Sequence, residues 1–380
     1  MPDDLAARSG TDAQRMSMRT PHAFKIGLFG ANCSSGRAVT KVAERWSGSW
    51  DDNLRLAQLA ERRGIDFLLP IGRWKGYGGE TNYQGSVLET IAWACGLLAS
   101  TERITVFATV HAPLFPPIIA AKQFVTADHI GKGRFGLNIV CGWNEGEFEM
   151  FGVTQRAHED RYGYAQEWLD AVSRMWSDTE AFDFDGEHLH LKRVESMPKP
   201  WGGSRPLLMN AGASPVGKAF AIRNCDALFI STNQDTFDST TQEVAELKGQ
   251  ARAQGREIDV YTVGAVACRP TTGEAQEYYR YCTIENADWA AVDNIMAMRG
   301  HTREKLGDAE FERRRRHTAH GLSGLPLVGD PDTVARDIAR LGEAGLRGIA
   351  VAMTNYADEL PFFADEVLPR LERAGLRSNT

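Results

Sequence analysis

The sequence predicts an α/β fold, a (β/α)8 TIM barrel, on three observations. From Lys25 onward, short apolar runs bounded by Gly, Pro and Asn alternate with longer stretches that carry apolar residues at helical spacing, a pattern typical of repeated βα units and a parallel sheet. The alternation predicts eight strands in one series. No Gly-x-Gly-x-x-Gly follows the first strand, which disfavours an open doubly wound sheet with a dinucleotide site.

The individual elements follow from this alternation. The predicted strands cover residues 25–29, 67–71, 105–110, 134–141, 207–210, 227–230, 260–268 and 348–353. The helices expected in the first half cover residues 50–63, 87–99, 117–130 and 161–176. Residues 182–191 combine an Asp-Gly turn with aromatic alternation, which predicts an inserted β-hairpin. About 80 residues separate the seventh strand from the eighth, more than one connecting helix needs, so we expect a long insertion before strand eight.

We expect a single domain over residues 23–380, preceded by a disordered tail over residues 1–22 that shows no periodicity. The insertion, about 275–325, contains the basic run 312–317 and several glycines. Two interpretations stay open for it: a lid over the C-terminal mouth of the barrel, and a helical appendage with a solvated basic face or an oligomer contact. Because neighbouring helix positions point in different directions, at most two of the four arginines at 313–316 can face one site.

Composition narrows the class of protein. The 380-residue chain is 43% hydrophobic and 24% charged, with a formal charge of -7, which gives no electrostatic reason to expect nucleic acid. It has no apolar run of the roughly 18 residues that span a bilayer and no signal-peptide pattern, so we expect no membrane partner and a cytoplasmic location. The six cysteines form no C-x-x-C pair, and His188 and His190 lack an apparent third ligand nearby, so we expect no metal site.

Several motifs occur together in one order along the chain. The stretch 131–143 reads GKGRFGLNIVCGW, Thr109 precedes the proline-rich VHAPLFPP, Gly-Glu-Phe stands at 146–148, and Asn-Ala-Gly-Ala-Ser stands at 210–214. Together with the acidic-then-aromatic segment 159–162, this order resembles the bacterial luciferase-like flavin monooxygenases over residues 25–371. Within that family the chain is most similar to the group of pyrimidine, dimethylsulfone and alkanesulfonate monooxygenases.

The resemblance implies a two-component monooxygenase that takes reduced FMN from a separate NAD(P)H-dependent flavin reductase. It implies that O2 is activated as a flavin peroxide, at N5 or at C4a, and that a small heterocycle, sulfone or sulfonate is oxygenated. A homodimer or homotetramer is expected from the family. Two alternatives stay open: a deazaflavin (F420)-dependent oxidoreductase of the same superfamily, and a flavin-binding subunit without catalytic activity.

The resemblance also assigns the cofactor and catalytic residues. Thr109 and Asn138 match positions that border the oxygen site beside the flavin ring, where the alternative is ordinary hydrogen bonding inside a barrel. The phosphate end is assigned to Arg161, Tyr162, Gly212, Ala213 and Ser214. These residue types supply a guanidinium, hydroxyls and approachable backbone amides. The alternatives are a local salt bridge for Arg161 and a helix cap for Ser214.

Softer assignments complete the predicted site. Glu147 and the pair Gly72 and Arg73 match flavin contacts, although Glu147 also fits a solvated residue of an acidic loop. His111 is the best titratable candidate beside the substrate, as a catalytic or pocket residue, with a packed histidine as the alternative. The remaining pocket-lining candidates are Trp143, Asn355 and Tyr356.

Overall fold

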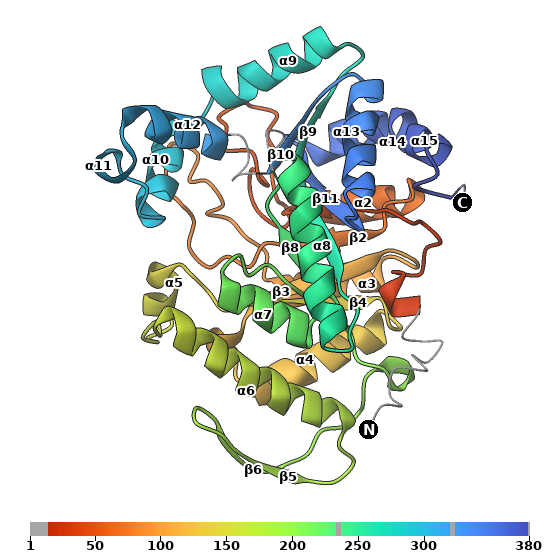
Figure 1. Ribbon diagram of the computed structural model, residues 1–380, viewed down its shortest axis with the longest axis vertical. Coiled ribbons are helices and arrows are strands. Elements are labelled where there is room, and N and C mark those ends of the chain that lie inside the picture. Colours follow the sequence, from red (N-terminus) through yellow and green to blue (C-terminus); the bar gives the residue numbers. More distant parts are fainter. Residues whose placement is uncertain (1–13, 233–236, 320–323, 379–380) are drawn as a thin grey trace. The chain divides into compact units, whose positions relative to one another are not determined.

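The computed structural model describes residues 14–232, 237–319 and 324–378 (Figure 1). Parallel strands alternate with helices to form a (β/α)8 barrel, so the predicted fold class is confirmed. The chain groups into two compact units, each described by itself below. Unit 1 comprises residues up to 20 together with 90–229 and 247–259, and unit 2 comprises 21–89, 230–246 and 260 onward.

The sheet of unit 1 consists of four parallel strands that pair in chain order. They are β3 (Thr105–His111), β4 (Phe135–Val140), β7 (Leu207–Asn210) and β8 (Ala227–Ile230). The helical segments are α3 (Thr90–Ala99), η1 (Ala112–Leu114), α4 (Pro117–Ile130), α5 (Glu145–Met150), α6 (His158–Ser177), η2 (Trp201–Gly203) and α7 (Pro215–Asn224). Helices α4, α6 and α7 lie side by side in Figure 1. Every residue of β3 is buried, because the strand is covered on both faces.

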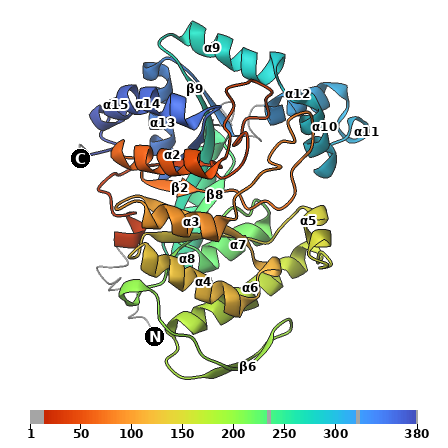
Figure 2. The same ribbon diagram turned by 180° about the vertical axis from the view of Figure 1, so that it is seen from behind.

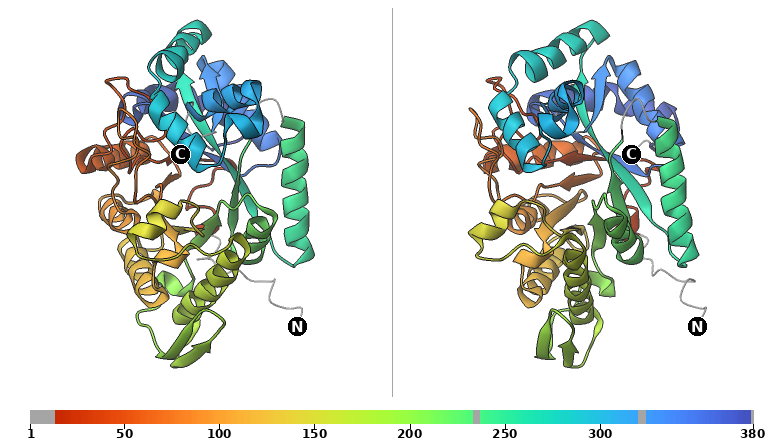
Figure 3. Two further views of the ribbon diagram at one scale, coloured as in Figure 1. Left: turned by 90° about the vertical axis from the view of Figure 1, so that its left-hand side faces the viewer. Right: turned by 60° about the vertical axis from the view of Figure 1, so that its left-hand side comes forward.

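The predicted hairpin is confirmed as β5 (Phe182–Asp185) and β6 (His190–Val194), an antiparallel pair that extends beyond α6 in both views of Figure 3. Glu167 of α6 holds its turn, since the carboxylate accepts hydrogen bonds from the backbone N–H groups of residues 187–189 at 2.7–3.0 Å. Those three bonds lower the pKa of Glu167, although burial acts in the opposite direction. Glu167 thus fixes the turn of the hairpin to α6, and Arg174 of the same helix donates a further hydrogen bond to the carbonyl of Asp183 on β5.

The sheet of unit 2 has the strand order β10, β9, β11, β1, β2, again all parallel. Its strands are β1 (Lys25–Phe29), β2 (Phe67–Leu69), β9 (Asp259–Cys268), β10 (Leu325–Gly329) and β11 (Gly348–Ala352). Figure 2 shows four of its helices gathered together: α2 (Trp50–Arg62), α13 (Pro331–Glu343), α14 (Tyr356–Glu366) and α15 (Leu368–Arg373). Helix α8 (Phe237–Ala253) contains the boundary between the units at residue 247.

The same packing device occurs once in each sheet. Gly27 of β1 stands opposite Phe67 of β2, and Gly136 of β4 stands opposite Phe107 of β3. A Cβ atom built on either glycine would overlap the phenylalanine ring, with the closest ring atoms at 2.3 Å and 2.2 Å. Each ring thus occupies the space that a side chain on the neighbouring strand would need.

Among the described residues, the connection between β9 and β10 contains five helical segments. The helical segments are α9 (Thr272–Arg280), η4 (Tyr281–Glu285), α10 (Trp289–Met298), α11 (Arg303–Leu306) and α12 (Asp308–Ala319). Helices α10 and α12 pack with the loops after β1 and β2 around a buried cluster that includes Val39, Tyr83, Val292 and Ile295. Asp288, fully buried, caps α10 and also accepts hydrogen bonds from Glu80 and Thr81. The interpretation of this insertion as a lid stays a prediction.

Residues 1–13 of the predicted tail lie outside the described residues, whereas residues 14–20 belong to unit 1 and begin with a helical turn. Arg15 is buried there and forms a bidentate ion pair with Asp128 of α4 at 2.7 and 2.9 Å. Asp128 in turn accepts the backbone N–H of Trp201. The ion pair of Arg15 with Asp128 therefore attaches the segment around Arg15 to helix α4 of unit 1.

Candidate functional site

Thr109 and Asn138 stand opposite each other at the C-terminal ends of β3 and β4, as the sequence predicts. Asn138 Nδ2 donates to Thr109 Oγ1 at 3.2 Å, and Thr90 Oγ1 donates to the carbonyl of Thr109 at 2.8 Å. Both members of the pair are buried. The remaining acceptor, Asn138 Oδ1, is buried without a hydrogen-bond partner among the described residues. Since buried polar atoms are nearly always satisfied, this oxygen points to a ligand as its partner.

His111 and Glu147 come together two residues beyond this pair. The Nε2 atom of His111, at the end of β3, lies 3.8 Å from Glu147 Oε2, and both side chains are buried. Glu147 belongs to α5, so the alternative of a solvated acidic loop does not hold for it. The separation of 36 positions between the two residues conceals this contact in the sequence. The pair forms a buried acid–base unit beside Thr109 and Asn138.

Asn144 is a residue that the sequence analysis missed. It precedes α5, and its side chain is buried, with Nδ2 lacking a hydrogen-bond partner among the described residues. Its carbonyl accepts the backbone N–H of Glu147. Asn138 Oδ1 is thus a buried acceptor, and Asn144 Nδ2 a buried donor, that the described residues leave unused. The only signal in the sequence is its place in the Gly-Trp-Asn that follows β4.

The turn after β4 depends on a glycine. Gly142 has φ +74°, and a Cβ atom there would lie 2.6 Å from the ring of Phe148. Arg161 Nη1 donates to the Gly142 carbonyl at 2.6 Å, so this arginine supports the turn as well as the predicted phosphate end.

The two neighbours of Gly142 differ in burial. Cys141 is buried, which raises the pKa of its thiol to about 12, whereas Trp143 exposes 41% of its surface. Trp143 is thus open to a ligand or to solvent.

Tyr162 and the loop after β7 form a cradle of small residues. The hydroxyl of Tyr162 makes a side-chain hydrogen bond with Ser214, and burial raises the pKa of the phenol. A Cβ atom on Gly212 would lie 2.7 Å from that hydroxyl and 2.8 Å from Gly217 Cα. Ser214 caps α7 by accepting the N–H of Gly217 at 3.2 Å, so its predicted capping role is present. Hydroxyls and amides at the start of a ten-residue helix suit a phosphate.

Asn210 fixes the loop that carries Gly212 and Ala213. Its Nδ2 donates to the carbonyl of Ile139 on β4 at 2.7 Å, and its Oδ1 accepts the N–H of Gly212 at 2.7 Å. Ala213 is exposed. Both ends of the Asn210 amide are used within the protein, so its role is to position the loop on the neighbouring strand.

Gly72 and Arg73 belong to unit 2, in the segment after β2. The Arg73 guanidinium lies over the ring of Tyr77, 4.6 Å from its centroid. Asn32 holds the start of the segment with both ends of its amide, since its Nδ2 donates to the Ile71 carbonyl and its Oδ1 accepts the Ile71 N–H. The assignment of Gly72 and Arg73 to the flavin stays a prediction.

Asn355 and Tyr356, at the start of α14, have supporting contacts within unit 2. Asn355 caps the helix, and its Nδ2 donates to the carbonyl of Glu44 at 3.0 Å. Tyr356 is fully buried, donates its hydroxyl to the carbonyl of Phe29, and packs edge-on against Trp46. Burial raises the pKa of this phenol strongly. The substrate-pocket assignment stays a prediction. Neither residue lines the cavity of about 40 Å³ at the ends of β9 and β11.

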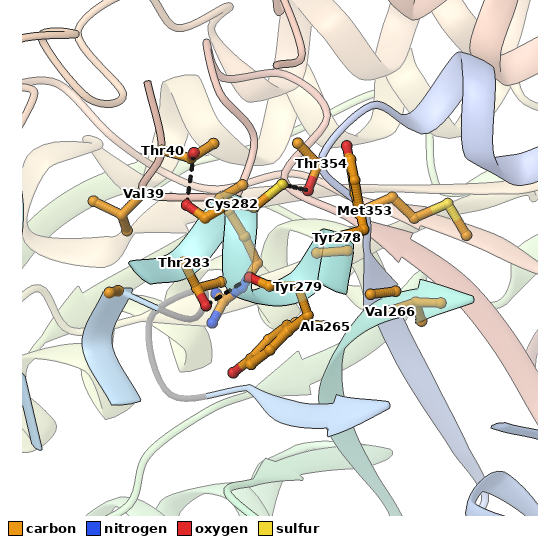
Figure 4. A pocket seen from close by; sticks show the side chains of 15 residues that line it. Val39, Thr40, Ala265, Val266, Tyr278, Tyr279, Cys282, Thr283, Met353 and Thr354 are labelled. Atoms are coloured by element: carbon orange, nitrogen blue, oxygen red, sulfur yellow. Dashed lines mark hydrogen bonds between the residues drawn. The ribbon is translucent and has the colours of Figure 1, made fainter. Parts of the chain in front are cut away.

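That cavity, of about 40 Å³, lies in unit 2 where β9 and β11 end (Figure 4). Its hydroxyl groups are used internally: Thr40 donates to the carbonyl of Cys282 at 2.8 Å, and Thr283 donates to that of Tyr279 at 2.8 Å. Thr354 Oγ1 lies 3.9 Å from Cys282 Sγ. Alanine, valine and methionine side chains form much of the remaining wall, together with Tyr278, Tyr279 and the buried Arg37.

The two histidines of the hairpin region, His188 and His190, each have an acidic partner nearby. His188 Nε2 lies 3.4 Å from Asp160, and His190 Nδ1 lies 2.7 Å from Asp185. In the part of the chain that the structure describes, no group of three or more His, Cys, Asp or Glu side chains is arranged to hold a metal ion. No helix within the same residues is long and apolar enough to cross a membrane.

Comparison with known proteins identifies the family. Residues 24–348 match the model of the luciferase-like monooxygenases. The FMNH2-dependent dimethylsulfone monooxygenase of Pseudomonas fluorescens (strain Pf0-1) is 28% identical over 357 residues, 91% of this chain and 94% of the relative. The pyrimidine monooxygenase RutA of Acinetobacter baylyi (strain ATCC 33305 / BD413 / ADP1) is 28% identical with the same coverage.

A solved structure of riboflavin lyase RcaE, with modified FMN and the substrate riboflavin, superposes with a TM-score of 0.82 at 22% identity. The match covers 93% of this chain and 92% of that one, and at this identity it supports the fold. The family match extends over most of the chain, from before β1 to the start of β11. The chain therefore belongs to the luciferase-like monooxygenase family and is a flavin-dependent oxidoreductase.

Proposed function

We propose that the protein is the oxygenase of a two-component system, which uses reduced FMN and O2 to oxygenate a small organic molecule such as a heterocycle, sulfone or sulfonate. The names of the relatives support the cofactor and the reaction type. The observation that carries the proposal is the buried pair of Thr109 and Asn138, with an unused acceptor on Asn138. A site for a polar ring at two strand ends is what a flavin monooxygenase requires.

The residues of unit 1 fit FMN. Asn138 Oδ1 and Asn144 Nδ2 offer a buried acceptor and a buried donor, which match the polar edge of an isoalloxazine ring. The cradle at Gly212, with Tyr162 and Ser214, would hold the phosphate. A side chain at Gly212 would fill that space.

Reduced FMN, when bound, supplies two electrons, so that one oxygen atom of O2 enters the substrate and the other leaves as water. Thr109 and Asn138 orient the reacting groups through the hydroxyl and the amide, and their burial keeps water away. His111 exchanges a proton at Nε2, the atom that faces Glu147. Glu147 holds the imidazole in place.

An anaerobic titration with reduced FMN, and separately with a reduced deazaflavin, tests the proposal. We expect reduced FMN to bind in the micromolar range or tighter, and mixing with O2 to produce a transient absorbance change of the flavin. Binding of the deazaflavin alone, without a reaction with O2, would favour the hydride-transferring alternative. Binding of neither would contradict a role in flavin chemistry.

The reductase is proposed to be a separate protein that delivers FMNH2 by diffusion. A dialysis cell that separates an unrelated NADH-dependent flavin reductase from this protein tests this part. Product formation on the oxygenase side is the expected result, and product formed only after direct mixing would require a complex. A homodimer or homotetramer is proposed as well, and light scattering coupled to gel filtration measures the mass of the assembly.

A further inference from the structure

One face of α6 lies against the inserted hairpin of β5 and β6. Positions 160, 163, 164 and 167 follow one another at helical spacing along α6, so they share this face. The carboxylate of Glu167 holds the hairpin turn through three backbone N–H groups. Figure 1 shows the hairpin alongside α6, with its turn toward the N-terminal half of the helix. The turn is therefore placed to contact the start of α6.

His188, in this turn, is the residue that reaches the start of the helix. Its Nε2 atom lies 3.4 Å from Asp160 Oδ1, and its side chain is 9% exposed. The imidazole lies tilted against the ring of Tyr164, with the centroids 5.9 Å apart. A Cβ atom on Gly163 would lie 3.3 Å from His188 Nε2, so the glycine lets the imidazole approach the helix closely. His188 is thus packed on α6.

His190, two positions further along the hairpin, contrasts with His188. Its Nδ1 atom lies 2.7 Å from Asp185 on the neighbouring strand, and its side chain is 64% exposed. Its acidic partner belongs to the hairpin itself, whereas the partner of His188 belongs to α6. The two histidines therefore differ in what they hold, and His190 provides a matched comparison for His188.

The first turn of α6 also carries residues assigned to the cofactor phosphate. Arg161 directly follows Asp160, and its Nη1 donates to the carbonyl of Gly142 at 2.6 Å. Tyr162 makes a side-chain hydrogen bond with Ser214. Since both side chains leave the helix within one turn of Asp160, a displacement of that turn would move the guanidinium and the phenol together. Groups that bind a ligand depend on such support for their geometry.

Asp160 has a second basic partner, which is more exposed than His188. Arg156 Nη1 lies 3.4 Å from Asp160 Oδ2, and its side chain is 39% exposed. Solvent screens an exposed ion pair, which therefore contributes little. Arg156 also precedes α6, whereas His188 is anchored on the hairpin turn that Glu167 holds. The contact with His188 is thus the better-defined constraint on Asp160.

We propose that the hairpin is a positioning element of the cofactor site and that His188 is its positioning residue. Through Asp160, His188 holds the first turn of α6 in the place from which Arg161 and Tyr162 meet the phosphate of FMN. His188 acts through Asp160 and not by contact with the cofactor. The inference rests on the proposed FMN-dependent function and adds a residue to that same site. The hairpin therefore raises the affinity for FMN and leaves the affinity for riboflavin unchanged.

Anaerobic titration of the full chain with reduced FMN and with reduced riboflavin tests this role. His188→Ala should weaken binding of reduced FMN about fivefold, the upper end for one partly exposed ion pair. Binding of reduced riboflavin, which lacks the phosphate, should change less than about twofold. An equal loss for the two flavins, or a lower free energy of unfolding with both affinities unchanged, would make His188 merely structural and overturn the proposal.

His188→Gln separates positioning from charge. The glutamine amide is neutral and places an N–H donor where His188 Nε2 faces Asp160, so it should recover most of the affinity for reduced FMN. Failure of His188→Gln to recover any affinity would assign the effect to attraction between the imidazolium and the phosphate, and would contradict the positioning role. His190→Ala, on the same hairpin, is the matched control and should bind both flavins like the wild type.

Glu167→Ala tests the hairpin as an element, because it releases the turn that carries His188. It should reproduce the loss specific to reduced FMN, and its combination with His188→Ala should add little to either change, since both act through one contact. Fully additive losses would mean that the two residues act separately. Failure of the wild type to bind reduced FMN would contradict the proposed function, whereas normal binding in His188→Ala would contradict the role of the hairpin alone.

Discussion

Asn138 shows how one side chain is prepared for a ligand. Its amide nitrogen is fixed by Thr109, which orients the amide, while the oxygen is buried with no partner among the described residues. An unsatisfied buried acceptor costs about 1–3 kcal/mol, so the fold tolerates it where a bound molecule later supplies the donor. This orientation is a stronger argument for function than the residue type alone.

The first prediction concerns this amide. Asn138→Ala should lower the rate of substrate oxygenation about 100-fold, because a preorganised polar group is lost where charge develops. Binding of reduced FMN should change less than about threefold, since the phosphate end is untouched. Single-turnover oxygenation and anaerobic titration measure the two quantities. A variant that loses flavin binding and oxygenation equally would show that Asn138 only anchors the cofactor.

The second prediction concerns the cradle at Gly212. Gly212→Ala should weaken FMN binding about tenfold or more, because the added methyl group meets the Tyr162 hydroxyl at 2.7 Å and occupies the phosphate space. The affinity for riboflavin, which lacks the phosphate, should fall less. Gly249→Ala is the control, since a Cβ atom there meets nothing within 4 Å. An equal loss of affinity for FMN and riboflavin would show that this loop does not bind the phosphate.

At the level of elements, the sequence predicts well what depends on periodicity. The bounds of β1 and α4 agree with the predicted residues 25–29 and 117–130, and the opposition of Thr109 and Asn138 follows from correct placement of two neighbouring strands. Strand β10 was not predicted, because its five residues contain Pro326 and directly follow the expected insertion; it pairs with β9 at the edge of the sheet order.

Short polar helices carry no such signal. Helix α5 reads EGEFEM and has six residues, fewer than two turns, so periodicity does not distinguish it from a loop. The contact of His111 with Glu147 and the burial of Asn144 depend on this helix. The sequence therefore identifies the strand-borne half of the site, and the half that α5 supplies requires the structure.

The third prediction concerns the glycine opposite Phe107. Gly136→Ala should lower the free energy of unfolding by about 1–3 kcal/mol, since the methyl group overlaps a ring in a packed sheet. Phe107→Leu in the same chain should recover part of the loss, and a double-mutant cycle by urea denaturation measures the coupling. Gly273→Ala, where the nearest atom lies at 4.0 Å, is the control. Strict additivity of the two substitutions would contradict the overlap.

At the level of the whole molecule, buried ionic groups attach chain-terminal segments to the strands. In unit 2, Asp66 accepts the backbone N–H of Ile26 at 2.8 Å and pairs with Arg377 at 2.6 Å. His22 lies 3.9 Å from the same carboxylate, and its Nδ1 accepts the N–H of Ser378 at 3.2 Å. The two ends of the described chain in unit 2 thus meet at one buried carboxylate.

The fourth prediction follows from the protonation state of His22. Burial, together with the charges of Arg377 and Lys25, lowers its pKa from 6.5 to about 4, although Asp66 acts in the opposite direction. The neutral ring is also the form whose Nδ1 accepts from Ser378. The unfolded chain therefore binds a proton more readily than the folded chain between pH 6.5 and pH 4. Stability from this residue is complete above pH 6.5 and is lost as the pH falls to 4, by about 3 kcal/mol in total.

His22→Asn keeps an acceptor near the Ser378 N–H and removes the titration. Urea denaturation from pH 7 to pH 4 should then show a smaller fall in the free energy of unfolding than in the wild type, with the two curves converging toward low pH. Arg316→Gln, an exposed substitution on α12 that removes no group titrating in this range, provides the control and should follow the wild-type curve. Parallel curves for His22→Asn and the wild type would mean that His22 is protonated in the folded protein, in which case the ring would donate to Asp66 and its pKa would be raised instead.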